Sequence, residues 1–356
     1  MTLGFVDESS EVARSAQVAA DGQDGRVTCP ASAPLDELDV GLVRALRDAT
    51  AAAAASVVPL VGSGDGMAVD GTAVDALRAA LAVIAVDGRV VAGEGEKDEA
   101  PMLAPGERFG TGGPTLDLAV DPVDGTRLAA SGRDGAMAVL AVSGRDGFAD
   151  LGPAHYLAKQ VTWLPDAAGL PIERLVRRLA DVRGVATADV RVAVQDRPRN
   201  AVVAARARAA GATVVPFEHG DIERSLRAAQ RGTDLDVVSG IGGAPEGLLT
   251  AAAVRALGAD MVASYAPQSA GEAERLAASG RSAATSLTLD DLCRGPAWLF
   301  LSAVTACRPG ADGVLEAARR EARGIRVASW HVGPRSSPRW SELIVGDDGV
   351  VVGVVS

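Results

Sequence analysis

The chain has 356 residues, of which 48% are hydrophobic and 41 are glycine, a composition typical of globular α/β proteins with a substantial core. Its 46 acidic and 35 basic residues give a formal net charge of −11. Such an excess of negative charge argues against non-specific binding to nucleic acid or to an anionic membrane surface. We therefore expect neither nucleic acid nor a membrane as a partner.

The cysteines and histidines indicate the cellular compartment and limit the kinds of metal site that the chain can form. The three cysteines, Cys29, Cys293 and Cys307, have no metal-binding spacing and predict a reducing compartment without a disulfide framework. The three histidines are far apart in the sequence, which argues against a histidine-rich zinc site. No apolar run is long enough to span a membrane, and no signal-peptide pattern is present, so we expect a cytoplasmic protein.

The first third of the chain predicts an extension followed by two helices. Residues 1–36 mix small, polar and acidic residues without periodicity, which predicts a mobile extension. One helix is predicted from about residue 38 to 58, and a glycine-rich run at 62–66 ends it. A second helix is predicted to begin near Asp70. That residue then lies on the buried face of the first turn, either as a functional carboxylate or as a helix-capping residue.

An acidic loop follows the next predicted strand, Arg89–Gly93. Glu94 comes directly after this strand and Asp98 four residues later, within the run GEGEKDEAPML. Acidic loops usually face solvent, but a carboxylate at the end of an apolar strand can also lie at the functional edge of a sheet. Both interpretations stay open at this point.

The run LDLAVDPVDGTRLAA, residues 116–130, is the most informative stretch. An apolar strand is predicted to end on Asp121, and Pro122 and Gly125 are predicted to turn the chain. Two carboxylates, Asp121 and Asp124, on one turn suit a hard divalent cation. Thr126 then lies at a helix start, where free backbone N–H groups favour a phosphate. The alternative is that Asp-Pro and Asp-Gly form only a turn.

The remainder alternates short strands with helices rich in alanine and arginine. Strands are predicted at 136–142, 191–194, 213–216, 236–240 and 298–304, with two weaker ones near 325–331 and 342–354. Helices are predicted up to about 210, over 246–257 and within 266–280. This alternation predicts a layered α/β sandwich. Glu246 then lies at a helix start after a glycine-rich turn.

Six acidic residues share a predicted position at a strand end or helix start: Asp70, Glu94, Asp98, Asp121, Asp124 and Glu246. Strand ends of this kind tend to meet at one edge of a sheet. Two divalent ions held by such carboxylates can polarise a phosphoryl oxygen and activate a water.

Three runs carry a family resemblance: VAGEGEKDEAPML (91–103), LAVDPVDGTR (118–127) and SGIGGAPEG (239–247). With them the chain resembles the class II fructose-1,6-bisphosphatases, in the lithium-sensitive sugar and inositol phosphatase superfamily, over roughly residues 38–304. The resemblance implies a layered αβαβα sandwich and a phosphoric monoester hydrolase, often a homo-oligomer. It also implies a metal-binding half, residues 37–165, and a substrate-binding half, residues 166–356, that contributes one metal ligand.

The resemblance assigns roles to individual residues. Asp70 and Glu94 serve a first metal, while Asp121, Asp124 and Glu246 hold a second, with Mg²⁺ or Mn²⁺ as the ions and two or more per site. Thr126, supported by Asp98 or Asp70, positions the attacking water. The residues implied in substrate binding are Asp124, Gly125, Thr126, Tyr156, Arg197, Pro198, Arg199, His219, Gly220, Asp221 and Gly243.

Several positions depart from the family pattern. Gly66 stands where the family usually has the lysine of Gly-Asp-Lys-Asn, and His219 stands where it has the first aspartate of Asp-Gly-Asp. Arg197 replaces a lysine, and residues 304–310 barely match the family. Three hypotheses follow: hydrolysis of fructose 1,6-bisphosphate by a metal-activated water, a paralogous phosphatase for another sugar, cyclitol or nucleoside phosphate, or a catalytically weak binding protein.

Overall fold

The computed structural model describes residues 38–93, 95–97, 100–334 and 336–355. The predicted extension of residues 1–36 and the candidate site residues Glu94 and Asp98 lie outside this range. All structural statements below concern the described residues.

Two mixed sheets form the frame of the described chain. The first has the strand order β17-β16-β15-β13-β6-β5-β1-β4, with β14 paired to β15, and the second has the order β12-β11-β7-β10-β8-β9. The strands of the first are β1 (Asp87–Ala92), β4 (Arg108–Phe109), β5 (Thr115–Asp124), β6 (Met137–Gly144), β13 (Ala297–Ala303), β14 (Arg319–Glu321), β15 (Gly324–Val332), β16 (Arg339–Val345) and β17 (Val351–Val354). Those of the second are β7 (Tyr156–Thr162), β8 (Arg191–Gln195), β9 (Thr213–Phe217), β10 (Val237–Gly243), β11 (Asp260–Tyr265) and β12 (Ser286–Thr288). A small separate hairpin pairs β2 (Gly95–Lys97) with β3 (Ala100–Met102).

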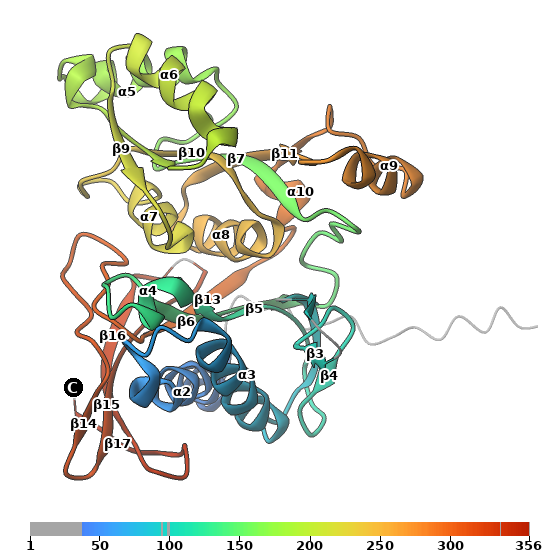
Figure 1. The fold of residues 1–356 in the computed structure, drawn as a ribbon, viewed down its shortest axis with the longest axis vertical. Helices are drawn as coiled ribbons and strands as arrows, with labels where there is room; N and C mark the ends of the chain where they lie inside the picture. Colours follow the sequence, from blue (N-terminus) through green and yellow to red (C-terminus); the bar gives the residue numbers. More distant parts are fainter. Residues whose placement is uncertain (1–37, 94, 98–99, 335, 356) are drawn as a thin grey trace, which may run out of the picture. The chain divides into compact units, whose positions relative to one another are not determined.

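Helices cover the sheets in three layers (Figure 1). Helices α2 (Val40–Ser56) and α3 (Gly66–Ala82) cover one face of the first sheet. Helices α7 (Asp221–Ala228) and α8 (Ala244–Leu257) lie between the two sheets, and α5 (Ile172–Arg183) and α6 (Ala201–Ala209) pack on the far face of the second. The result is the predicted αβαβα sandwich. The shorter helices are α4 (Thr126–Ala130), α9 (Ala270–Ala278) and α10 (Leu289–Leu292), with 3₁₀ turns at Val58–Leu60, Thr187–Asp189 and Pro198–Asn200.

Each helical layer has its own apolar core, which explains the sequence patterns. The central strand β5 is buried at almost every position, because helices cover both faces of its sheet. Helix α2 contributes the buried alanines 51–55, whose small side chains let the helix approach the sheet and α3 closely. Each larger side chain that these layers bury, such as Leu46 or Leu77, stabilises the fold by about 1.5–3 kcal/mol.

The start of α3 differs from the prediction. The helix begins at Gly66, four residues before Asp70, because the Asp65 side chain accepts a hydrogen bond from the backbone N–H of Ala68 at 3.0 Å. Asp70 therefore lies in the second turn, and neither its predicted first-turn position nor its alternative role as helix cap is correct. Its carboxylate instead accepts a hydrogen bond from Thr126 Oγ1 at 2.6 Å.

Strand β5 also differs from the prediction, since it continues through Asp121 and Pro122 to Asp124. Its pairing with β6 shifts register between Asp121 and Asp124, and such an irregularity accommodates a proline that cannot donate to the sheet. The turn comes at Gly125, which has a φ of +82° that favours glycine. Thr126 then begins α4, as predicted.

The other predicted strands and helices are present with shifts of a few residues, except at the C-terminus. Residues 342–354, predicted as one weak strand, belong to two strands, β16 and β17, joined by a tight turn. Strand β7 and helices α5 and α7 lie in stretches that the sequence analysis did not assign. No helix in the described ranges has the length and apolar character needed to cross a bilayer.

Candidate active site

A pocket of about 1160 Å³ lies between the two sheets. The first sheet contributes the ends of β1 and β5, and the second contributes β7, β10 and the neighbouring starts of α7 and α8. Most residues predicted for the site line this pocket: Asp70, Asp121, Asp124, Gly125, Thr126, Tyr156, Arg199, His219, Gly220, Asp221, Gly243 and Glu246. Arg197 and Pro198 do not line it, and Glu94 and Asp98 lie outside the described residues.

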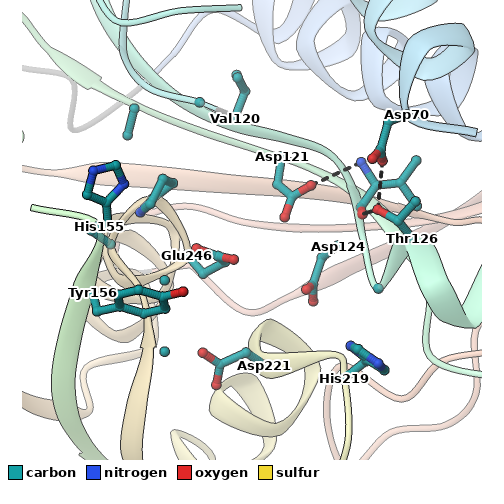
Figure 2. A pocket seen from close by; sticks show the side chains of 18 of the residues that line it. Asp70, Val120, Asp121, Asp124, Thr126, His155, Tyr156, His219, Asp221 and Glu246 are labelled. Atoms are coloured by element: carbon teal, nitrogen blue, oxygen red, sulfur yellow. Dashed lines mark hydrogen bonds between the residues drawn. The ribbon is translucent and has the colours of Figure 1, made fainter. Parts of the chain in front are cut away.

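Four carboxylates border the pocket, two from β5 and two from the helices α7 and α8 (Figure 2). Asp121 and Asp124 come from β5, Asp221 is the first residue of α7, and Glu246 lies in the first turn of α8. Asp124 is only 5% exposed, and its Oδ2 accepts a hydrogen bond from the backbone N–H of Ile222 at 3.3 Å. Burial, together with the charges of Asp221 and Glu246, raises the pKa of Asp124 to about 7. The site therefore concentrates negative charge that a cation would stabilise.

The donor chemistry of this cluster fits a hard divalent cation. Its ligands would all be carboxylate oxygens, which Mg²⁺ and Mn²⁺ prefer over nitrogen or sulfur. In the described ranges, no group of three or more acidic, histidine or cysteine side chains is arranged to hold a metal ion by itself. Glu94, a predicted ligand, follows β1 directly but is outside those ranges.

A threonine hydroxyl lies two residues after Asp124 and also lines the pocket. Thr126 Oγ1 lies 2.6 Å from Asp70 Oδ1 and 2.9 Å from the carbonyl oxygen of Val123 (Figure 2). A hydroxyl carries one proton, and the charged, closer Asp70 is the stronger acceptor. Donation to Asp70 leaves a lone pair of Thr126 Oγ1 able to accept a hydrogen bond from a water bound in the pocket. The predicted support of Thr126 by Asp70 is thus geometrically available, while support by Asp98 falls outside the described residues.

Position 66 lies beside this threonine. A Cβ atom added to Gly66 would be 3.5 Å from Thr126 Cγ2, an ordinary van der Waals distance. Gly66 itself lines the pocket, at the N-terminal end of α3. The residue that departs from the family pattern is therefore part of the pocket wall.

The pocket lining also includes an arginine held over a tyrosine of the second sheet. The Arg199 guanidinium carbon is 4.8 Å from the centre of the Tyr156 ring, and Arg199 Nε donates to the carbonyl oxygen of Ile241 at 3.2 Å. The buried Asn200 fixes the same turn, because its side chain accepts from Ile241 N at 2.7 Å and donates to Gln195 O at 3.1 Å. Arg199 therefore presents a positive charge in a set orientation.

His219 lies near further arginines at the rim of the pocket. Burial and the positive charges of Arg197 and Arg127 lower the pKa of His219. Arg197 itself does not line the pocket and donates to the backbone oxygens of Asp196 and Glu218, both at 3.0 Å. Its structural contribution is thus to hold the loop that carries His219.

The sequence analysis missed some residues of the site. Lys159 on β7 forms an ion pair with Asp221, and Asn200 orders the turn of Arg199. Arg127 and His155 also line the pocket. A lysine within a run that mixes apolar with polar residues, Tyr156–Thr162, was the available signal for Lys159, but that stretch was not predicted as a strand.

A layered αβαβα sandwich with an acidic pocket between its sheets is typical of the phosphatases that act on small phosphate esters. The chain matches, over residues 40–337, the family described as bacterial fructose-1,6-bisphosphatase, glpX-encoded. The chain therefore belongs to the bacterial class II fructose-1,6-bisphosphatase family. Members of this family are metal-dependent phosphoric monoester hydrolases.

Curated relatives agree with this assignment. The chain is 38% identical over 270 residues to a fructose-1,6-bisphosphatase class 2 of Haemophilus influenzae. The matched residues make up 70% of this chain and 80% of the relative. It is 40% identical over 228 residues to a D-fructose 1,6-bisphosphatase class 2/sedoheptulose 1,7-bisphosphatase of Prochlorococcus marinus, covering 62% and 67%. It is also 40% identical over 218 residues to fructose-1,6-bisphosphatase 1 class 2 of Escherichia coli, covering 60% and 64%.

Proposed function

We propose that this chain hydrolyses fructose 1,6-bisphosphate to fructose 6-phosphate and inorganic phosphate with the help of Mg²⁺ or Mn²⁺. The observation that carries this proposal is the pocket itself. It joins acidic side chains, a threonine hydroxyl directed by Asp70 and an ordered arginine in one lining. Family membership supports the same reaction and substrate class.

Asp121, Asp124 and Glu246, together with Asp70 and Glu94, are the proposed metal ligands, with two or more ions per site. Bound divalent ions supply positive charge that polarises phosphoryl oxygens and neutralises the leaving oxygen. The carboxylates of the described ligands line the same pocket, where the ionised form of Asp124 is disfavoured by burial and by the charges of Asp221 and Glu246. Cation binding would relieve that repulsion.

Thr126 and Asp70 orient the attacking water in this proposal. The Thr126 hydroxyl donates its proton to Asp70 Oδ1, so one of its lone pairs accepts a hydrogen bond from water. This contact holds the water oxygen toward the phosphorus atom, and water attacks in line with the departing ester oxygen. Proper orientation of a nucleophile is a large part of catalysis in phosphoryl transfer.

The remaining pocket residues bind the sugar phosphate. Arg199, stacked on Tyr156, offers a charged fork for a phosphate group that is not cleaved. Asp221, His219 and the backbone of Gly125, Gly220 and Gly243 are the proposed contacts for sugar hydroxyls and phosphate oxygens. Pro198 would act indirectly by shaping the turn that carries Arg199.

A second candidate is a paralogous phosphatase for another sugar, cyclitol or nucleoside monophosphate. The observation that favours it is the absence of a side chain at Gly66, next to Thr126, where a cation would contact the phosphate. His219, which stands where the family has an aspartate, also changes the pocket lining and favours the same candidate. A catalytically weak binding protein is the remaining alternative.

The test is inorganic phosphate release by the purified protein with Mg²⁺ or Mn²⁺. The panel contains fructose 1,6-bisphosphate, sedoheptulose bisphosphate, sugar and inositol monophosphates and nucleoside 5′-monophosphates. Preference for fructose 1,6-bisphosphate supports the first proposal. Preference for a monophosphate with an inert bisphosphate supports the paralogous phosphatase, and no release from any compound supports the binding protein.

The resemblance further implies a cytoplasmic homo-oligomer, and we carry both features as proposals. Cys293 and Cys307 are free and buried, as in a protein of a reducing compartment. Light scattering after size-exclusion chromatography tests the oligomeric state.

A further inference from the structure

A lysine ammonium is buried beside the active-site pocket. Lys159 lies on β7, a central strand of the second sheet, between Gly240 of β10 and Ala263 of β11. Its side chain is only 2% exposed, and its Nζ donates to Asp221 Oδ2. Because a buried ammonium is costly without a charged partner, this pair must be retained for the lysine to be tolerated.

Asp221 connects this lysine to the pocket. The aspartate is the first residue of α7, follows Gly220 with a φ of +79°, and lines the pocket with its side chain 13% exposed. One carboxylate oxygen is engaged by Lys159 on the closed side, while the partly exposed side chain borders the cavity. The carboxylate is thus the link between a buried cation and the space for substrate.

The neighbouring backbone leaves room for this pair. A Cβ atom at Gly242 of β10 would lie 2.5 Å from Asp221 Oδ2 and 3.6 Å from Lys159 Nζ. Any larger residue at position 242 would therefore displace the carboxylate. Because Gly242 of β10 has no side chain, the Asp221 carboxylate can lie against this strand, between Lys159 and the pocket.

The Lys159 ammonium also offsets negative charge at the site. Asp221 lies close enough to the buried Asp124 for its charge to disfavour ionisation of Asp124. Lys159 offsets the charge of Asp221 from the side away from the cavity. It can do so without entering the pocket, where it would compete with a cation for the other carboxylates.

We propose that Lys159 is a positioning residue for substrate binding, which acts by holding the Asp221 carboxylate toward the pocket as a hydrogen-bond acceptor for a sugar hydroxyl. Lys159 does not contact the reacting atoms. This inference rests on the proposed function, in which Asp221 binds the sugar phosphate. It adds the residue that gives Asp221 its orientation.

The test compares Lys159→Met, Asp221→Asn and the double variant in steady-state hydrolysis of fructose 1,6-bisphosphate. Loss of one charge-assisted hydrogen bond predicts a KM about 10-fold higher for each single variant, with kcat within about 3-fold of wild type. The double variant is expected to match the weaker single variant, because both substitutions remove one interaction. Lys159→Arg is expected to recover most of the affinity.

Arg183→Met is the matched control. Arg183 Nη1 pairs with the buried Asp236, just before β10, at 2.6 Å, and neither residue lines the pocket. This variant is expected to lower the melting temperature without changing KM. It separates loss of an ion pair in the second sheet from loss of the orientation of Asp221.

With a folded Lys159→Met variant, two results overturn the inference alone. One is an unchanged KM in a folded Lys159→Met variant, and the other is a double variant whose loss equals the product of the single losses. If Lys159→Met does not fold, the double variant leaves no unpaired charge, and a KM near that of wild type in this variant also overturns the inference. Absence of phosphate release by the wild type overturns the proposed function and this inference together.

Discussion

The Thr126 hydroxyl lies 2.6 Å from Oδ1 of Asp70, a residue 56 positions earlier in the chain. Thr126 begins α4 directly after the turn at Gly125, and Asp70 projects from the second turn of α3. The pair therefore depends on the packing of α3 against α4 and not on local sequence. It places a directed hydroxyl at the pocket wall beside the turn that follows the buried Asp124.

Replacing Thr126 with alanine removes this hydroxyl. We expect kcat for phosphate release to fall by about 10²–10³-fold with little change in KM, since orientation of the water matters in the transition state. Thr126→Ser keeps the hydroxyl and is expected to retain most of the rate. Steady-state kinetics of the two variants measures this difference. Equal rates for alanine and serine would show that the hydroxyl does not orient the water.

Asp121→Asn and Glu246→Gln each remove one negative charge from the proposed metal site. We expect both variants to lose turnover almost completely while they keep the wild-type fold, because a hard divalent ion needs anionic oxygen ligands. Chelation of divalent ions by EDTA is expected to abolish wild-type activity, and added Mg²⁺ or Mn²⁺ to restore it. Phosphate release and circular dichroism measure the two effects. Near-wild-type turnover in either variant contradicts the assignment.

Gly66→Lys introduces a cation at the pocket wall beside Thr126. The site has room for a Cβ, since Gly66 has no positive φ and the nearest atom would be Thr126 Cγ2 at 3.5 Å. If the bisphosphate is the substrate, we expect kcat/KM to rise by about 10-fold, since the added charge neutralises phosphate. Gly66→Met is the control for side-chain volume. A gain in kcat/KM in both variants, or in neither, would show that a missing positive charge at position 66 does not limit activity on the bisphosphate.

We expect the buried His331 to make the folded protein less stable in acid. Its side chain is 7% exposed and stacks on Phe300 with ring centres 5.7 Å apart, and its Nδ1 has no hydrogen-bond partner among the described residues. Burial and the charges of Arg47 and Arg339 lower the pKa of His331 to about 4. In the unfolded state the His331 side chain has a pKa of about 6.5, so it binds a proton at a higher pH than in the folded state. The free energy of unfolding is expected to decrease between pH 6.5 and 4.

The variant His331→Phe keeps an aromatic ring and removes the titrating group. Its unfolding free energy is expected to fall less than that of wild type between pH 7 and 5, by on the order of 1 kcal/mol after allowance for solvent screening. Denaturant unfolding at the two pH values measures the difference. The same acid loss in both proteins would show that other groups cause it.

Local sequence patterns were sufficient for much of the fold. The apolar run before Asp121 predicts the buried strand β5, and the glycine-rich turn before Glu246 predicts the start of α8, because strand burial and helix starts depend mainly on neighbouring residues. The alternation of strands and helices was enough for the layered class. The convergence of Asp121, Asp124 and Glu246 on one pocket was anticipated from their positions at strand ends and helix starts.

Tertiary structure alone decided how distant segments meet. Strands β13–β17 return to the first sheet, although the intervening strands form the second, and this order depends on pairing between residues far apart in the chain. The pairs of Thr126 with Asp70 and Lys159 with Asp221 span 56 and 62 positions. No local propensity encodes such pairs. The packing of the layers brings them together, and the cost of burying the charge of Lys159 is offset by Asp221 only in the folded chain.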